Sequence, residues 1–435
     1  MIFHIRLYLT VLIVCILPSV AVADGASLTL PAAITEALRT QPQVLQSAHT
    51  MAAGRDLSRA AHAALLPQIS LVAGSIWSES RNGHPLFIAA NGPREVIGQI
   101  QVSVPLYAPQ LHALARAAND QSAITRSQET ATRLVVAAQV VNAYYQLDLL
   151  QIQATIWRST LNLAQKLYLD TQKAYAAGAV SQLDLVQTAL LRNNARTGLQ
   201  QTAAETRAAT RLLNLQIGRA PDGEIMLSNG QEFASPLLSP SLLDTQAKRM
   251  QPLVQVADRQ IALGRAQIQV QRGATLPTIS AGAAYGVDTV TVPRTGDLGW
   301  QGAVTLSMPI FGFGAHKDQI AAAQEQVAAL RAARQALILQ IDSQIAHDYG
   351  AAQAADKTLD NARTTAREAF SVYTMTRKGY FAGALNALNL AQAEGSWVRT
   401  RLRLASARIA VQMTRAQLEL DMGRYPAEKK EISNT

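Results

Sequence analysis

Cysteine, aromatic residues and long apolar runs are all scarce in this sequence. Its 435 residues include one cysteine, and aromatic residues make up 5% of the chain. A single cysteine cannot form an intramolecular disulfide, so packing or assembly must hold the chain together. The few aromatic side chains argue against a conventional large globular core, whereas abundant alanine favours closely packed helices. After the N-terminal segment no run of about 18 apolar residues occurs, so the sequence predicts no transmembrane helix.

The N-terminus is typical of a cleavable secretory signal. One basic residue, Arg6, precedes an apolar run at residues 7–17, and small residues follow in the segment Ala21–Ala23. Signal peptidase recognises this order of segments. Cys15 lies inside the apolar run between two large apolar neighbours rather than behind small residues, which argues against lipidation. We therefore predict a signal peptide at residues 1–23 and export of a mature chain that contains no cysteine.

The charged and nucleophilic residues form no pattern that is typical of an enzyme. The chain carries 39 basic and 30 acidic residues, and the basic surplus is spread along helical segments rather than gathered beside aromatics. This distribution argues against nucleic-acid binding. Histidines are scattered without HExxH or Cys/His spacing, which predicts no metal site. The sequence contains no Gly-x-Ser-x-Gly elbow and no paired acid constellation. We expect a non-enzymatic protein without a cofactor.

The chain contains one structural unit that occurs twice. Residues 41–70 align with residues 251–280 without a gap, and both segments end in Leu-Pro-x-Ile-Ser. The stretch "YAAGAV" that begins at Tyr175 corresponds to "YFAGAL" that begins at Tyr380, 205 residues later. Matching segments in the same order predict a duplication. We place a first repeat at residues 24–230, a second repeat at 231–426 and a C-terminal tail at 427–435.

Each repeat has the same predicted order of elements. A helical pattern, at 31–64 or 240–274, is ended by proline. Two strands and a helical hairpin follow: strands at about 66–79 and 96–107 with a hairpin at about 110–217, then strands at about 276–288 and 299–311 with a hairpin at about 315–422. From Gln110 to Thr171 about 60 residues contain neither Pro nor Gly. At about 1.5 Å per residue this predicts a helix of roughly 90–100 Å, and therefore coiled-coil packing.

Apolar and polar residues alternate along the second strand of each repeat. One face contains Ile100, Val102, Val104, Val304, Leu306 and Met308, and the other contains Gln99, Gln101 and Thr305. Such alternation is typical of a half-buried sheet in a soluble protein as well as of strands that face lipid. Export, sufficient strand length and aromatic residues near the strand ends favour the lipid-facing interpretation. Four strands cannot close a barrel, so the barrel must be shared: two chains would give eight strands and three chains twelve.

The order of these motifs resembles that of the TolC family of outer-membrane efflux channels. The resemblance rests on the duplicated unit, the junctions "ALLPQIS" and "ATLPTIS", the segments "VPLY" and "MPIF", and the Tyr-x-x-Gly corners. It implies an α+β membrane protein: a homotrimer with a twelve-stranded barrel in the outer membrane of a Gram-negative bacterium, continued by a long α-helical coiled-coil tunnel into the periplasm. It also implies outer-membrane lipid, a periplasmic adaptor (membrane fusion) protein and an inner-membrane pump as partners.

In this family the two corners are hairpin tips that close the periplasmic mouth. The resemblance therefore implies hairpin tips and adaptor docking at Gly178, Ala179, Val180, Gly383, Ala384 and Leu385. It implies a gate at Asp184, Tyr380, Leu385, Asn389 and Gln392, with a hydrogen bond between Asp184 and Tyr380. TolC itself has an arginine at the position of Leu385 and aspartates at those of Asn389 and Gln392. Leucine makes no charge-assisted bond, so we expect a weaker or apolar latch and a neutral polar ring instead of a cation-binding one.

These features together predict a channel. We expect an outer-membrane exit duct of a tripartite efflux system, which passes small molecules such as drugs or metal ions from adaptor and pump to the exterior. Two alternatives stay open. One is an outer-membrane channel of type I protein secretion, and the other is an exported periplasmic structural coiled-coil protein.

Overall fold

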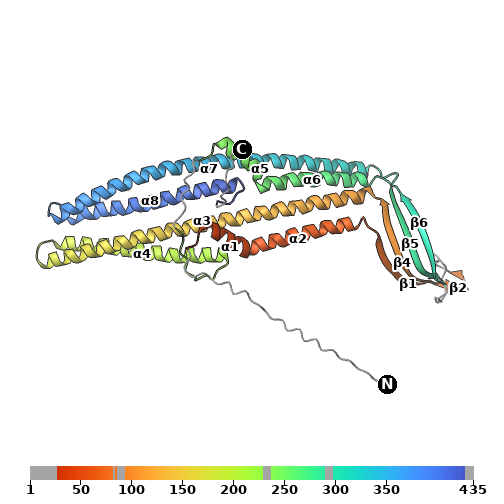
Figure 1. Ribbon diagram of the computed structural model, residues 1–435, viewed down its shortest axis with the longest axis horizontal. Coiled ribbons are helices and arrows are strands. Elements are labelled where there is room, and N and C mark those ends of the chain that lie inside the picture. The colour runs from red at the N-terminus through yellow and green to blue at the C-terminus, as the bar shows by residue number, and fades with distance from the viewer. Residues whose placement is uncertain (1–26, 82–83, 86–93, 229–236, 290–296, 427–435) are drawn as a thin grey trace, which may run out of the picture.

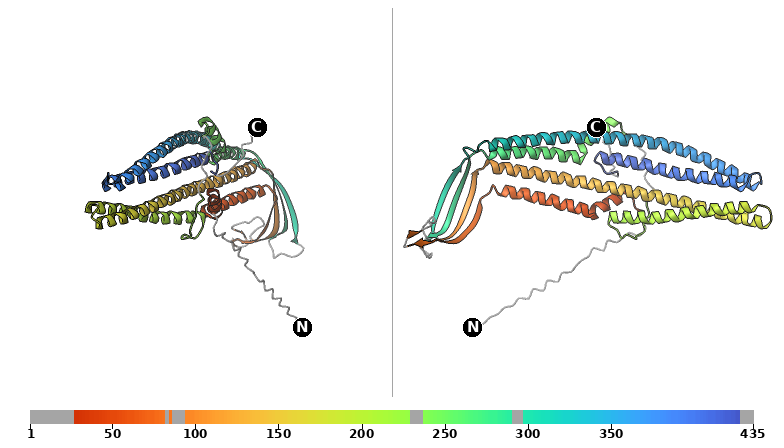
Figure 2. Two further views of the ribbon diagram at one scale, coloured as in Figure 1. Left: turned by 60° about the vertical axis from the view of Figure 1, so that its left-hand side comes forward. Right: turned by 180° about the vertical axis from the view of Figure 1, so that it is seen from behind.

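The computed structural model of the chain describes residues 27–81, 84–85, 94–228, 237–289 and 297–426. The predicted signal peptide, which includes Cys15, and the tail at 427–435 lie outside these residues. The molecule is long and narrow: helices run along its length, and a four-stranded sheet lies at one end (Figure 1). The sheet bends away from the helix ends, and the two helical hairpins lie at the opposite end of the molecule (Figure 2).

Both halves of the chain build their elements in the same order. The first half contains α1 (Leu30–Thr40), α2 (Pro42–Ala63), β1 (Gln68–Trp77), the short β2 (Ser80–Arg81) and β3 (His84–Pro85), β4 (Arg94–Tyr107), α3 (Pro109–Ala176) and α4 (Gln182–Ile217). The second half contains α5 (Pro240–Met250), α6 (Pro252–Gly273), β5 (Thr278–Thr289), β6 (Gly299–Ser307), α7 (Ala315–Phe381) and α8 (Ala387–Asp421). Among the described helices, none combines the length and hydropathy needed to cross a membrane.

A break interrupts the first helical segment of each half. The helical pattern predicted in each half therefore consists of two helices. Gln41 and Gln251 have extended backbone at the break, with ψ of 125° and 119°, since the proline that follows each of them disfavours helical dihedrals. Each glutamine side chain donates to a carbonyl near the end of a distant helix. Gln41 Nε2 lies 3.1 Å from the oxygen of Leu215, and Gln251 Nε2 lies 3.1 Å from that of Asp421.

The sheet has the order β1-β4-β5-β6, and all neighbouring strands are antiparallel. Directly paired residues share a face, so the register groups side chains into rows across the four strands. One such row is Leu71, Ile100, Tyr285 and Trp300. The adjacent row on the opposite face is Ser70, Gln101, Ala284 and Gln301. The sheet therefore has one apolar face and one face of small and polar residues.

Met308 does not belong to this apolar face, and its assignment to the strand was wrong. β6 ends at Ser307, which pairs with Thr278, the first residue of β5. Pro277, which comes before Thr278, has no N–H group with which to extend the ladder. Pro309 follows Met308 directly. Met308 therefore lies past the paired residues, with an exposed side chain.

The helices pack around the middle of α3. Val140, Tyr144 and Leu147 of α3 belong to the largest buried apolar cluster, which also contains residues of α1, α4 and α8. The Tyr144 hydroxyl donates to the carbonyl of Leu28 (3.0 Å) and so fastens the segment before α1 to this cluster. Val44 of α2 also belongs to the cluster, so five helices from both halves share one core, which makes the two repeats a single packed unit.

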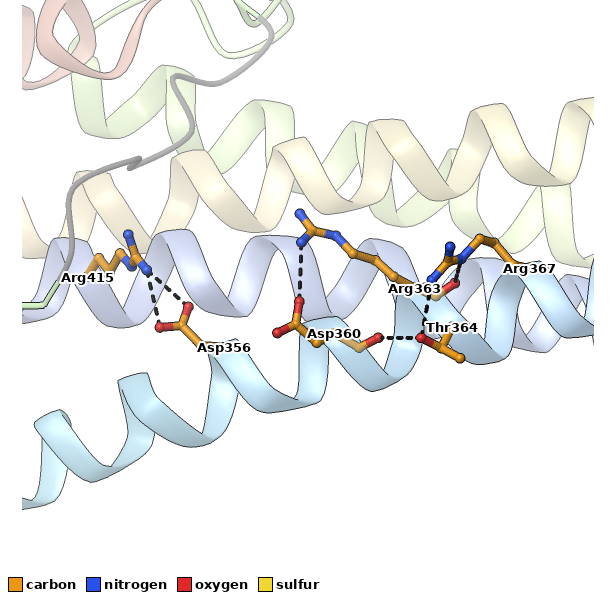
Figure 3. Close-up of polar contacts among 6 residues, drawn as sticks. All are labelled: Asp356, Asp360, Arg363, Thr364, Arg367 and Arg415. Atoms are coloured by element: carbon orange, nitrogen blue, oxygen red, sulfur yellow. Dashed lines mark hydrogen bonds and ion pairs between the residues drawn. The ribbon is translucent and has the colours of Figure 1, made fainter.

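An ion pair connects α7 with α8 near this core. Nη2 of Arg415 on α8 lies 3.1 Å and 3.2 Å from the two carboxylate oxygens of Asp356 on α7 (Figure 3). One turn further along α7, Asp360 accepts a hydrogen bond from Arg363 (3.3 Å) within the same helix. The side chain of Arg415 is 16% exposed, against 46% for Arg363. The pair between the helices is therefore the better shielded from solvent and salt.

Two carboxyl groups meet where α7 passes the end of α8. Asp348 is buried and accepts a hydrogen bond from Gln344 (2.7 Å), while Asp421 accepts one from Gln417 (2.9 Å). Burial raises the pKa of Asp421 from 3.8 to about 7, and the neighbouring Asp348 contributes to this rise. Burial opposes ionisation of Asp348 as well, but hydrogen bonds from Asp421, His347 and Gln344 lower its pKa. Below about pH 7 the proton of the pair is therefore held by Asp421.

This pair predicts a pH-dependent effect of Asp421→Asn. The raised pKa means that the folded chain holds the Asp421 proton more tightly than the unfolded chain. Stability is therefore lost as the pH rises from about 4 to about 7. Asparagine cannot ionise, yet it can donate to Asp348 and accept from Gln417. Relative to the parent, we expect the melting temperature of the variant to rise by about 2–4 °C between roughly pH 5 and pH 8.

Thermal unfolding of both proteins across this pH range measures the effect. Glu368→Gln, which removes an exposed carboxylate of α7 that takes no part in this pair, is the matched control and should show no such trend. A difference between Asp421→Asn and its parent that does not change with pH would contradict the shared proton.

Candidate functional site

Both helical hairpins turn through the same backbone motif. Gly178 and Gly383 follow the ends of α3 and α7 with φ of +73° and +74°. The amides of the next residues, Ala179 and Ala384, each donate to the carbonyl five residues earlier, at 2.9 Å in both hairpins. A bond of this kind after a left-handed residue is a Schellman motif, which satisfies the last carbonyls of a helix. Glycine is required at both corners because other residues are strained at these dihedrals.

The helices after the corners begin with matching capping boxes. The Asp184 amide donates to Ser181 Oγ (3.2 Å), and the Ser181 amide donates to Asp184 Oδ2 (3.1 Å). In the other hairpin the Asn389 amide donates to Asn386 Oδ1 (3.0 Å), and the Asn386 amide donates to Asn389 Oδ1 (3.4 Å). Asp184 and Asn389 were predicted as pore residues, and their capping role was not predicted. The available signal was the three-residue spacing from a Ser or Asn at the N-cap.

Asp184 also joins the two hairpins. Its Oδ1 atom accepts a hydrogen bond from the amide of Ala387, the first residue of α8 (3.3 Å), while its Oδ2 atom accepts the hydroxyl of Ser181 (2.7 Å). The bond from the Ser181 hydroxyl is the main cause of a lowered pKa at Asp184, which burial opposes. The carboxylate lies at the N-termini of α4 and α8, where the helix dipoles favour negative charge. Within the described residues, the bonds of Asn389 stay inside its own hairpin.

Tyr380 does not bond to Asp184 in the chain, so that prediction was wrong. The Tyr380 hydroxyl lies 3.3 Å from the hydroxyl of Thr171 on α3. Tyr380 precedes its corner, and its ring packs against a buried apolar cluster between the hairpins. Asp184 follows the other corner, and both of its oxygens already accept the bonds described above. The two hairpins are therefore connected at two separate points.

A groove with a volume of 1020 Å³ lies between the two tips. Asp184, Tyr380 and Asn389 line it together with the predicted tip residues Gly178, Ala179, Val180, Gly383, Ala384 and Leu385. Leu385 covers Gly379, where an added Cβ would lie 2.8 Å from the leucine Cδ1 atom. Gln392 is exposed on α8 and is not among the lining residues. The structure therefore brings together the predicted gate residues with the exception of Gln392.

The apolar face of the sheet is a second candidate site. Leu71 is 74% exposed, Val304 72% and Leu306 67%. Ile100 is also exposed, while Val102 and Val104 are half-buried on the same face. Trp77 and Trp300 lie at the strand ends farthest from the helices. A continuous apolar surface across four strands is too extensive for an ordinary water-exposed face and marks a contact with lipid or protein.

A family model for outer membrane efflux proteins matches residues 33–218 and 243–424. These residues include both hairpins and make up most of the chain. The chain therefore belongs to the outer membrane efflux protein family, which confirms the resemblance seen in the sequence. Its location is the outer membrane.

Two curated relatives come from Pseudomonas aeruginosa. Outer membrane protein OprJ is 23% identical over 329 residues, which are 73% of this chain and 68% of OprJ. Pyoverdine export outer membrane protein OpmQ is 26% identical over 313 residues, which are 68% of this chain and 61% of OpmQ. The match thus spans less than two thirds of OpmQ.

Solved outer-membrane channels share the fold. The structure of CusC has a TM-score of 0.79 at 20% identity and covers 91% of this chain and 92% of CusC. The open state of the Neisseria gonorrhoeae MtrE outer membrane channel has a TM-score of 0.77 at 19% identity, covering 91% of this chain and 89% of MtrE. The arrangement of a helical body with strands at one end is therefore that of outer-membrane channels.

Substitutions of the two equivalent capping residues, Asp184 and Asn389, should have different effects, because only Asp184 contacts the other hairpin. Asp184→Ala should free the Ala387 amide in the other hairpin, whereas Asn389→Ala should loosen only the start of its own helix, α8. A hydrogen bond to a charged acceptor is worth about 1.5–3 kcal/mol when buried, and less where water reaches it. We therefore expect amide exchange at the start of α8 to become about tenfold faster in Asp184→Ala.

Hydrogen exchange followed by mass spectrometry measures both helix starts in each variant. In Asn389→Ala, the first turn of α4 should exchange like the parent. If Asp184→Ala changes exchange only within its own hairpin, the bond to Ala387 does not connect the tips.

Proposed function

We propose that three copies of the chain form the outer-membrane exit duct of a tripartite efflux system. The observation that carries this proposal is a four-stranded sheet with one exposed apolar face and two edge strands, β1 and β6. Lipid offers no partners for the backbone groups of an open edge, and closed membrane barrels have at least about eight strands. Pairing β6 of one copy with β1 of the next closes the barrel. Three copies, as the family resemblance implies, give twelve strands.

In this assembly the apolar face of the sheet contacts outer-membrane lipid. The lipid-facing residues include Ile100, Val102, Val104, Val304 and Leu306. The opposite face, with Gln101 and Gln301, lines the lumen. The exposure of the apolar side chains in the single chain and the register that aligns them support this assignment. The helices then continue the lumen as a tunnel into the periplasm.

The hairpin tips form the periplasmic mouth in this proposal. They lie at the end of the molecule opposite the sheet (Figure 1). Three copies bring six corners together, and the gate consists of Asp184, Tyr380, Leu385, Asn389 and Gln392. The bond from Asp184 to Ala387 and the apolar side chain of Leu385 hold the mouth closed, in place of a charged latch. Neutral side chains at Asn389 and Gln392 leave these positions without a carboxylate ring for cations.

In this proposal the hairpin tips also bind a partner protein. The corner residues Gly178–Val180 and Gly383–Leu385 contact a periplasmic adaptor protein, which connects the channel to an inner-membrane pump. The cargo is a small molecule, such as a drug or a metal ion. The relative OpmQ is named for pyoverdine export, which favours efflux over type I protein secretion, the second candidate function. Family membership gives no support to a purely structural coiled-coil protein.

The subunit number tests the shared barrel. Because β1 and β6 need partners in lipid, we expect the protein extracted from outer membranes in detergent to have the mass of three chains. In planar bilayers the same preparation should conduct ions. A stable, membrane-inserted monomer, or a trimer that never conducts, would rule out the proposed duct.

The face of the sheet is tested by two neighbouring residues of β6. Leu306→Arg would place a charge in lipid and should disfavour insertion by about 2–4 kcal/mol near the bilayer midplane. Thr305→Arg is the matched control, because Thr305 pairs with Ser280 on the opposite face and a charge there faces the lumen. Quantitative comparison of the two variants in isolated outer membranes measures the effect. Equal losses, or a greater loss for Thr305→Arg, would show that the lipid face is wrongly assigned.

A further inference from the structure

A second groove lies on the helical wall, away from both the hairpin tips and the sheet. It has a volume of 790 Å³ and is lined by one face each of α2, α3 and α6. α2, α6 and the part of α3 that packs against them lie in the half of the body that is nearer the sheet (Figure 1). Neither the proposed gate nor the proposed lipid face includes any of its residues.

Three arginines from three different helices line this groove: Arg55 of α2, Arg126 of α3 and Arg259 of α6. All three are exposed, so their guanidinium groups are accessible to a ligand. The groove also contains the polar side chains of Asn119 and Gln255. It therefore offers donors from three directions, which a row of arginines along one helix would not provide.

Carboxylates do not neutralise these arginines. The groove contains one acidic side chain, Asp258, and it is paired outside the groove with Arg334 of α7 (2.5 Å). Arg55 forms a long ion pair with Asp56, at 3.9 Å, and Asp56 also pairs with Arg59. Within the described residues, no ion pair is formed by Arg126 or Arg259. The groove thus keeps an excess of positive charge.

Helices α2 and α3 approach each other closely next to this groove. An added Cβ at Gly54 would lie 2.6 Å from Thr125 Oγ1, so α2 approaches α3 more closely than a larger residue would allow. Arg55 and Arg126 are the residues that directly follow Gly54 and Thr125. Three arginines that line one groove raise its positive potential, which favours a bound anion.

We propose that this groove binds a multivalent oxyanion, a group of the phosphate or carboxylate type with at least two negative charges. Guanidinium groups present paired N–H donors that match two oxygens of such a group. Three guanidiniums around one cavity favour a ligand with several anionic centres over a monovalent ion. The side-chain amide of Gln255 supplies a further donor, whereas that of Asn119 already lies 3.5 Å from His62 Nε2. This binding does not depend on the channel function proposed above.

Calorimetric titration of the detergent-purified full chain with inorganic tripolyphosphate at low salt tests the site. We expect saturable binding of one tripolyphosphate per chain, weakened by added salt. The double variant Arg126→Gln/Arg259→Gln should bind at least about tenfold more weakly, a change of about 1.4 kcal/mol in binding free energy. The matched control is Arg207→Gln with Arg196→Gln, two exposed arginines of α4 outside the groove, which removes the same charge and should bind like the parent.

Three results would overturn the proposal. The first is no saturable binding to the parent protein. The second is equal weakening in the groove variant and in the α4 control, because binding would then follow overall charge. The third is a change in subunit number or melting temperature of the groove variant without any bound anion, since the arginines would then serve assembly or folding. Native mass and thermal unfolding of each variant distinguish this third result from loss of a ligand site.

Discussion

The two unpaired edges of the sheet constrain every other feature of this protein. In the part of the chain that the structure describes, β1 and β6 each pair with one neighbour only, so each has a row of backbone N–H and C=O groups without a partner strand there. Water can satisfy such groups, but the hydrocarbon core of a membrane cannot. A chain whose sheet is apolar on one face therefore has to assemble before that face can lie in lipid. Assembly of the sheet also fixes how the helices that continue from β4 and β6 are arranged.

Backbone groups also need hydrogen-bond partners at the breaks and corners of the helical body. Each helix end leaves backbone groups without an intrahelical partner, and this chain satisfies them by the same device in both halves. Gln41 and Gln251 reach the carbonyls of distant helix ends, and Gly178 and Gly383 close the last turn before each corner. The duplicated chain thus repeats its hydrogen bonds as well as its order of elements, which keeps two very long hairpins in register.

The two halves differ at one pair of equivalent capping residues. Asp184 and Asn389 occupy equivalent positions in their capping boxes. Only the carboxylate of Asp184 also accepts a hydrogen bond from the other hairpin, from the amide of Ala387 at the start of α8. One oxygen of an ionised carboxylate is enough for the cap, and the second remains available. The amide of Asn389 has one carbonyl oxygen, which its own cap already uses. The difference between an acid and an amide therefore turns one of two equivalent caps into a contact between hairpins.

The sequence by itself determined the duplication, the order of helices and strands, and the corners, because these depend on local periodicity and on proline and glycine. It also determined which strand residues share a face, since side chains alternate along a strand. Only the tertiary structure decided which polar groups lie close together and form hydrogen bonds. Tyr380 meets Thr171 instead of Asp184, Met308 lies past the paired part of β6, and arginines of three helices line one groove. These outcomes depend on how distant segments approach one another, and local sequence patterns carry no information about that approach.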